Sequence, residues 1–164
     1  MAMTTERIIS LAALTVLELS PPQQVRCAAD AGFRHVSIRL LPATPGEPQH
    51  DVVGDTPLRR ELEAALADTG LEVLDAEIFR LKPDTDVAAY EAAIAVAARL
   101  GARTLLVAGN DPDEARLTDR FGAFCDLAAR YRLGASLEFM PWTDAKDLTQ
   151  AARDGKLDPV IGRD

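Results

Sequence analysis

Charged side chains occupy alternate positions in three apolar stretches of this 164-residue sequence. Arg39 belongs to the first stretch, Asp75 and Glu77 belong to the second, and Glu138 belongs to the third. The apolar positions between them are Val36, Ile38 and Leu40; Leu74, Ala76 and Ile78; Leu137 and Phe139. Alternation of this kind is typical of β-strands, whose successive side chains point to opposite faces. We therefore expect the charged groups to share one interior face while the apolar groups pack under helices.

Burial of an unpaired carboxylate is costly, so these groups must be ion-paired, metal-bound or solvated in a cavity. Arg39 offers a purely structural solution, because it could neutralise Asp75 or Glu77 in an ion network. No basic residue stands close to Glu138 in the sequence, which favours a functional role for this carboxylate.

Three further residues near the predicted strand ends are candidates for substrate binding. Arg80 and Lys82 follow the second of these strands, and either could contact an anionic or polyhydroxylated substrate or form an ordinary solvent-facing loop charge. Trp142 could form an apolar wall for a sugar ring, or it could be a loop plug.

The elements that must position these residues form a repeated pattern of a short strand, a loop and an amphipathic helix. The predicted strands are Ile8–Leu14, His35–Leu40, Leu71–Phe79, Arg103–Gly109 and Ala135–Met140. Helix starts are predicted at Ser20-Pro21, with Gln23 completing a capping box, at Thr56-Pro57, after Asp84–Asp86, and at Asp111–Glu114. Gly32, Gly70 and Gly101 are candidate helix ends.

A spacing of about 30 residues per unit indicates right-handed βαβ units and a parallel sheet. An open doubly wound sheet would need a glycine-rich turn after the first strand, but the segment from Leu14 to Pro22 contains no glycine. The sequence therefore predicts an incomplete (β/α) TIM barrel of about five units, without strands six to eight, because a complete barrel typically needs about 250 residues.

Composition excludes several other classes of protein. The net charge is −8 and the sequence has no basic stripe, which argues against nucleic-acid binding. Two cysteines and two histidines lack the spacing of a zinc site or disulfide framework. The sequence has no apolar run of about 20 residues and no signal-like leader, so we expect a cytoplasmic protein without membrane contact.

Three motifs carry a resemblance to a known family. Leu137-Glu138-Phe139-Met140-Pro141-Trp142-Thr143 resembles the fifth strand of the sugar phosphate isomerase/epimerase group with the xylose isomerase-like TIM barrel. Residues 74–81 and 106–109 resemble its third and fourth strands, and the likeness extends from about Ile8 to about Gln150. We assign residues 1–143 to the partial barrel and residues 144–164 to a C-terminal helix and divergent tail.

The resemblance implies a divalent-metal enzyme that moves a proton next to a carbonyl of a sugar or polyol. It assigns to Glu138 the roles of metal ligand and acid/base residue. Beside it we expect Glu77 as a second catalytic carboxylate, which could add a second metal ligand if the geometry allows, and we expect Arg39, Asp75, Arg80 and Trp142 to contact the substrate. Oxygen ligands favour manganese or magnesium, with zinc or cobalt as alternatives. The family's remaining metal ligands come from strands six to eight, so we expect weak activity or none.

Residues 148–164 resemble a different group, the segment that precedes the first ATPase module of Clp-type AAA+ unfoldases. This stretch carries no Walker motif, and ATP binding is not inferred from it.

Two other functions stay open at this point. The first is a lyase or dehydratase on the same scaffold. The second is a non-catalytic half-barrel that binds or assembles with a partner. In either case the unpaired edges of an incomplete barrel predict a homo-oligomer.

Overall fold

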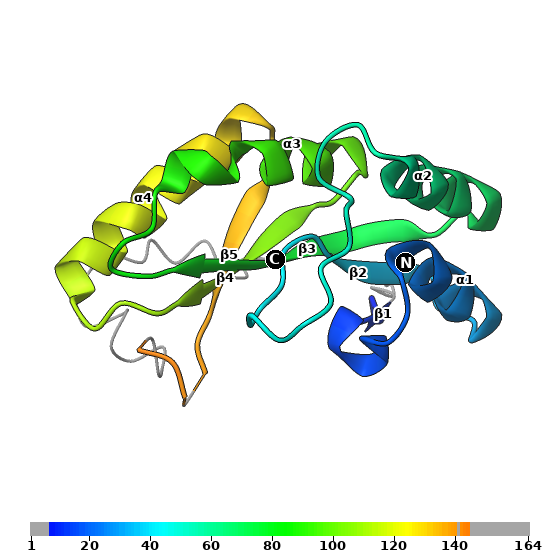
Figure 1. Ribbon diagram of the computed structural model, residues 1–164, viewed down its shortest axis with the longest axis horizontal. Coiled ribbons are helices and arrows are strands. Elements are labelled where there is room, and N and C mark those ends of the chain that lie inside the picture. Colours follow the sequence, from blue (N-terminus) through cyan, green and yellow to red (C-terminus); the bar gives the residue numbers. More distant parts are fainter. Residues whose placement is uncertain (1–6, 141, 145–164) are drawn as a thin grey trace, which may run out of the picture.

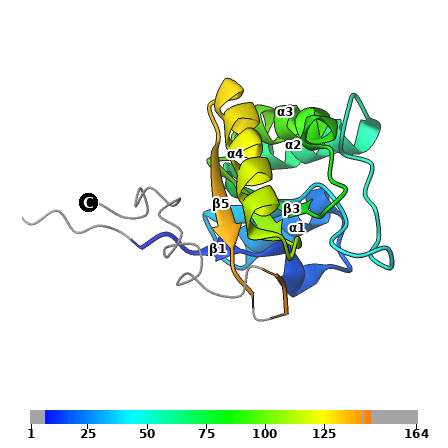
Figure 2. The same ribbon diagram turned by 90° about the vertical axis from the view of Figure 1, so that its left-hand side faces the viewer.

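The computed structural model describes residues 7–140 and 142–144. They form one parallel five-stranded sheet in the order β1-β2-β3-β4-β5, and the helices cover one face of it (Figures 1 and 2). The strands are β1 (Ser10–Leu11), β2 (His35–Arg39), β3 (Glu72–Leu81), β4 (Thr104–Gly109) and β5 (Gly134–Glu138). The helices are α1 (Pro21–Asp30), α2 (Pro57–Thr69), α3 (Glu91–Arg99) and α4 (Glu114–Arg130), with 3-10 turns η1 (Ala13–Val16) and η2 (Val87–Tyr90).

The predicted helix signals are confirmed at several ends. The side chain of Gln23 accepts a hydrogen bond from the Ser20 backbone N–H at 2.9 Å, as a capping box requires. Thr56 caps α2, and Gly70 ends it in the left-handed conformation at φ 69°. Helix α4 begins after Asp113, whose carboxylate accepts from the Arg116 N–H at 2.9 Å.

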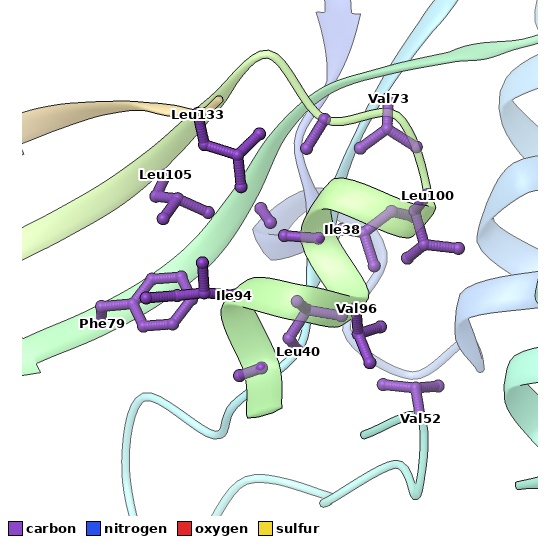
Figure 3. Close-up of a cluster of buried hydrophobic side chains, with 14 of the residues drawn as sticks. Ile38, Leu40, Val52, Val73, Phe79, Ile94, Val96, Leu100, Leu105 and Leu133 are labelled. Carbon is purple, nitrogen blue, oxygen red and sulfur yellow. The ribbon is translucent and has the colours of Figure 1, made fainter. Parts of the chain in front are cut away.

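The hydrophobic core lies between the sheet and its helices (Figure 3). Ile38 of β2 and Leu40, the residue after β2, belong to this core as the sequence predicted. Ile94 of α3 also packs there. Phe79 and Phe124 are fully buried, and their rings lie 5.2 Å apart, which fastens β3 to α4.

The predicted alternation of β3 is right at Ala76 but wrong at its other two apolar positions, Leu74 and Ile78. Val73, Ala76, Phe79 and Leu81 belong to the core, whereas the sequence had assigned this face to Leu74, Ala76 and Ile78. The cause is two register shifts, one against β2 beyond Val73 and one against β4 between Ala76 and Phe79. Each irregularity reverses the faces that follow, as a β-bulge does.

The first strand is shorter than predicted. β1 covers only Ser10–Leu11, and Ala13–Val16 form a 3-10 turn instead of continuing the strand. Ile8 and Ile9 before β1 are 48% and 62% exposed.

Within the described residues, β1 and β5 each pair on one side only. None of the helices in the described part of the chain is long and apolar enough to cross a membrane. Apart from Asp144, the predicted C-terminal helix and tail lie outside the described residues.

Candidate functional site

The polar side chains of β2 and β3 lie on the sheet face that the helices do not cover. Val36 and Ile38 enter the core, which turns Ser37 and Arg39 to the opposite face. In the parallel ladder Ser37 is opposite Asp75, and Arg39 is opposite Glu77. The structure therefore brings together Arg39, Asp75 and Glu77, three of the four charged positions that the sequence singled out.

Arg39 is the centre of an ion network. Its Nη2 lies 3.3 Å from Glu77 Oε1, and its Nη1 lies 2.7 Å from Glu47 Oε2. Glu47 Oε2 also accepts a hydrogen bond from the Ala43 N–H at 2.9 Å. The structural role that the sequence left open for Arg39 is thus present.

Sequence reasoning missed Glu47. It lies in the Pro- and Gly-rich connection between β2 and α2, where nothing in the sequence pattern marks it. Its position shortly after the end of the Arg39 strand is the signal that could have found it. The Arg39 guanidinium and the Ala43 N–H hold the pKa of Glu47 below its usual value, although partial burial opposes them.

Burial has the opposite effect on the two carboxylates of β3. Burial raises the pKa of Asp75, although the Ser37 hydroxyl donates a hydrogen bond to Asp75 Oδ2 at 2.7 Å. Burial also raises the pKa of Glu77 against the attraction of Arg39, and the negative charges of Asp75 and Glu138 raise it further. Glu77 thus holds its proton more tightly than an exposed glutamate does.

Glu138 ends β5 on the same face. Ala108 of β4 is its ladder partner, and Ala108 is in turn the partner of Arg80 on β3. The small alanine side chain separates the carboxylate from the guanidinium along one row of the sheet. Glu138 is half-buried and forms no hydrogen bond or ion pair with any described residue, so its carboxylate is available to a ligand.

Arg80 stands at the edge of an open groove of about 630 Å³ beyond the strand ends. Its Nε donates to the Ala43 carbonyl and its Nη1 to Asn110 Oδ1, both at 2.8 Å. Asn110 directly precedes the predicted helix start at Asp111–Glu114, but its side chain holds Arg80, and Asp113 caps α4. Ala43, Lys82 and Asn110, which line the groove, follow β2, β3 and β4, so the groove lies beyond the carboxyl ends of these three strands.

Trp142 is not joined to this cluster. It is 77% exposed and does not line the groove that Arg80 and Asn110 form. The structure leaves its predicted contact with a substrate untested.

The described residues do not fit a metal centre. Among residues 7–140 and 142–144, no group of three or more His, Cys, Asp or Glu side chains is placed to hold an ion. Ser37 and Arg39 already contact the carboxylates of Asp75 and Glu77. Glu138 by itself offers one carboxylate, which is too few ligands for a divalent ion.

Comparison with solved structures identifies the fold. A xylose isomerase domain protein from Salmonella typhimurium LT2 superimposes with a TM-score of 0.71 at 19% identity, over 93% of this chain and 57% of that one. A xylose isomerase-like TIM-barrel protein from Mycobacterium smegmatis, solved in complex with magnesium, gives 0.66 at 16% identity over 95% and 62%. The IolI protein with a bound zinc atom gives 0.67 at 14% identity over 90% and 57%.

These likenesses confirm the predicted fold, a partial TIM barrel similar to that of the xylose isomerase-like proteins. The chain spans 57% to 62% of the length of these three structures. No family model matches the sequence.

A second, short match concerns a different protein. Twenty residues, 12% of this chain, are 95% identical to the chaperone protein ClpB of Rhodopseudomonas palustris and cover 2% of it. This finding confirms the resemblance to Clp-type proteins, which the sequence places in residues 148–164, outside the described residues.

Proposed function

We propose that this chain carries part of the active site of a sugar or polyol isomerase/epimerase, in which Glu138 and Glu77 move a proton next to a carbonyl group. The observation that supports the proposal most is the row of carboxylates on the uncovered sheet face, where Glu77 is buried and its pKa is raised. The solved structures of the same fold include xylose isomerase-like proteins, which act as precedent.

The two glutamates differ in the way that acid/base partners differ. Glu138 is half-buried with no protein partner among the described residues, so it is suited to accept a proton from carbon. Glu77 is 6% exposed with a raised pKa, so it is suited to donate a proton to a substrate oxygen. Asp75 would hold a substrate hydroxyl and Arg80 a polar group at the far end of the substrate, whereas Arg39 positions Glu77 because its charge is already engaged.

A divalent ion, manganese or magnesium by preference and zinc or cobalt as alternatives, would polarise the carbonyl in such a reaction. Glu138 is the ligand that this chain would supply. The other ligands would have to come from outside the described residues.

Solvent deuterium exchange tests the proposal directly. The full chain is incubated in D₂O with a panel of aldoses, ketoses and polyol-derived ketones, with and without Mn²⁺ or Mg²⁺, and deuterium at the carbon next to the carbonyl is measured by NMR. We expect exchange to be lost in Glu138→Gln and reduced about 10²-fold or more in Glu77→Gln, the usual scale of acid/base catalysis. Glu61→Gln removes an exposed carboxylate on α2 and should leave exchange unchanged.

Absence of exchange from every compound, with the chain folded, would remove the catalytic proposal. A second candidate function would then lead, a non-catalytic half-barrel that assembles with a partner. The observation that favours it is the lack of a metal-binding group among the described residues, together with two sheet edges that pair on one side only there.

A further inference from the structure

We propose that Arg80 is the recognition residue for an oxyanion, a phosphate or carboxylate group carried by the ligand of this chain. The inference deepens the proposed function and rests on it for the placement of a ligand over the strand ends. It assigns the chemical class of that ligand, which the fold alone leaves open.

Arg80 differs from the other buried and half-buried arginines in its ion pairing. Among the described residues these are Arg39, Arg59, Arg80, Arg116 and Arg120. Every one of them except Arg80 has a carboxylate oxygen within 4.0 Å: Glu47 and Glu77, Asp55 and Glu63, or Asp111. Arg80 is therefore the one in this set with no carboxylate oxygen within 4.0 Å among the described residues, and its charge acts on Glu47 only from a longer distance.

The guanidinium of Arg80 is nevertheless held in place. Two neutral oxygens, the Ala43 carbonyl and Asn110 Oδ1, accept from Nε and Nη1 at 2.8 Å each. They come from the segments that follow β2 and β4, so Arg80 is fixed from both neighbouring strands. A guanidinium has five N–H donors, and the Nη2 amino group has no acceptor among the described residues.

Arg80 lines the groove beyond the strand ends. Lys82 adds a second positive charge to the lining, while Asp84 and Asp144 add two negative ones. The groove is therefore neutral in sum, and it lies on a chain whose net charge is −8. Long-range electrostatic attraction therefore does not favour an anion in this groove. Binding must depend on hydrogen bonds from the guanidinium of Arg80.

The surroundings favour an oxyanion over a neutral hydroxyl. An arginine that is partly withdrawn from water, preorganised and free of a carboxylate offers planar paired donors that match phosphate or carboxylate oxygens. The carboxylates of Glu138 and Glu77 lie on the same sheet face as Arg80. A ligand bound by its anionic group at Arg80 would extend its uncharged part toward them.

Titration of the full chain with inorganic phosphate and, separately, with acetate tests the inference at constant ionic strength. The Nε–Hε NMR signal of Arg80, assigned by its loss in Arg80→Lys, should shift in a saturable way with at least one of the two anions. Saturation by phosphate alone identifies a phosphorylated ligand, and saturation by acetate alone identifies a sugar acid. No saturable shift with either anion overturns the proposal.

Binding constants from calorimetry provide the second measurement. Arg80→Gln should weaken binding about tenfold or more, the scale of one charge-assisted hydrogen bond. Arg26→Gln removes the same charge from an exposed position on α1 and should leave the affinity unchanged. Equal affinity in Arg80→Gln and the unchanged chain contradicts the proposal.

The signal titration is carried out on the unchanged chain, and neither measurement needs turnover. Anion binding without deuterium exchange would therefore separate this inference from the catalytic proposal. Exchange without anion binding would retain the catalytic proposal and remove the assigned ligand class.

Discussion

Arg39 and Glu77 are partners in the parallel ladder of β2 and β3, and their side chains approach to 3.3 Å, yet the pKa of Glu77 is raised and not lowered. Loss of hydration outweighs the single long contact, because Arg39 makes its shorter contact, 2.7 Å, with Glu47. The arginine thus stabilises the connection after β2 more than it stabilises the charge of Glu77.

Because the pKa of Glu77 is raised, ionisation of this side chain should lower the stability of the folded chain as pH rises. A carboxyl whose pKa is higher in the folded than in the unfolded chain binds more protons when folded, so its contribution to stability falls as pH rises above about 4. We expect the free energy of unfolding of Glu77→Gln to rise relative to that of the unchanged chain as pH increases from about 4 to about 7. Urea unfolding at several pH values measures this difference, and Glu61→Gln on the exposed side of α2 provides the control. A difference that stays constant with pH would contradict the assignment.

Asp111 predicts the opposite pH behaviour. Its buried carboxylate accepts hydrogen bonds from Arg116 at 2.6 Å and from Arg120 at 2.9 Å, and Arg116 holds the pKa of Asp111 below its usual value. We expect Asp111→Asn to lower the melting temperature by several degrees at neutral pH. The deficit should shrink as pH falls below about 4, where the unfolded chain protonates this group first. Asp119→Asn, an exposed change on α4, should have little effect at any pH.

The aromatic contact between β3 and α4 predicts a large loss of stability on truncation. Phe124 is fully buried against Phe79, with ring centres 5.2 Å apart. Phe124→Ala should cost about 3–5 kcal/mol of unfolding free energy in denaturant titration. Phe139→Ala makes the same change where the ring is 42% exposed, and we expect less than about 1 kcal/mol there. Similar losses in the two variants would mean that the core is not where the structure places it.

The two outer strands predict association between copies of the chain. Ile8 and Ile9 precede β1, and Phe139 and Trp142 follow β5, so exposed apolar side chains flank both strands that pair on one side only in the described part of the chain. Light scattering should give a mass above 17.7 kDa that rises with concentration. Ile9→Lys should lower that mass, because charge on an edge opposes pairing. A strictly monomeric chain at high concentration would count against this prediction.

The parallel order of the strands was accessible from the sequence because local signals marked nearly every helix boundary. Ser20 with Gln23, Thr56 with Pro57, and Gly70 act through contacts between residues a few positions apart, which the sequence displays directly. The length of β1 was not accessible, because an edge strand is limited by pairing on one side alone.

The candidate site was predicted in part for the same reason. Alternation in β2 correctly placed Arg39 on the sheet face that points away from the core, because the pairing of that strand is regular beyond Ser37. It failed for Leu74 and Ile78 because a register shift depends on how neighbouring strands fit together, which no single strand reveals. Glu47 and Asn110 were missed as contacts of Arg39 and Arg80 because their partners come from other segments of the chain.

The register shift before Asp75 has a consequence for which changes this strand tolerates over evolutionary time. Leu74 has no Cα partner on β2, since the ladder passes from Val73 directly to Asp75. Removal of the residue would rotate the side chains that follow it to the wrong face, whereas replacement of its half-buried side chain leaves the register in place. We expect sequences that descend from a common ancestor with this chain to retain a residue at position 74.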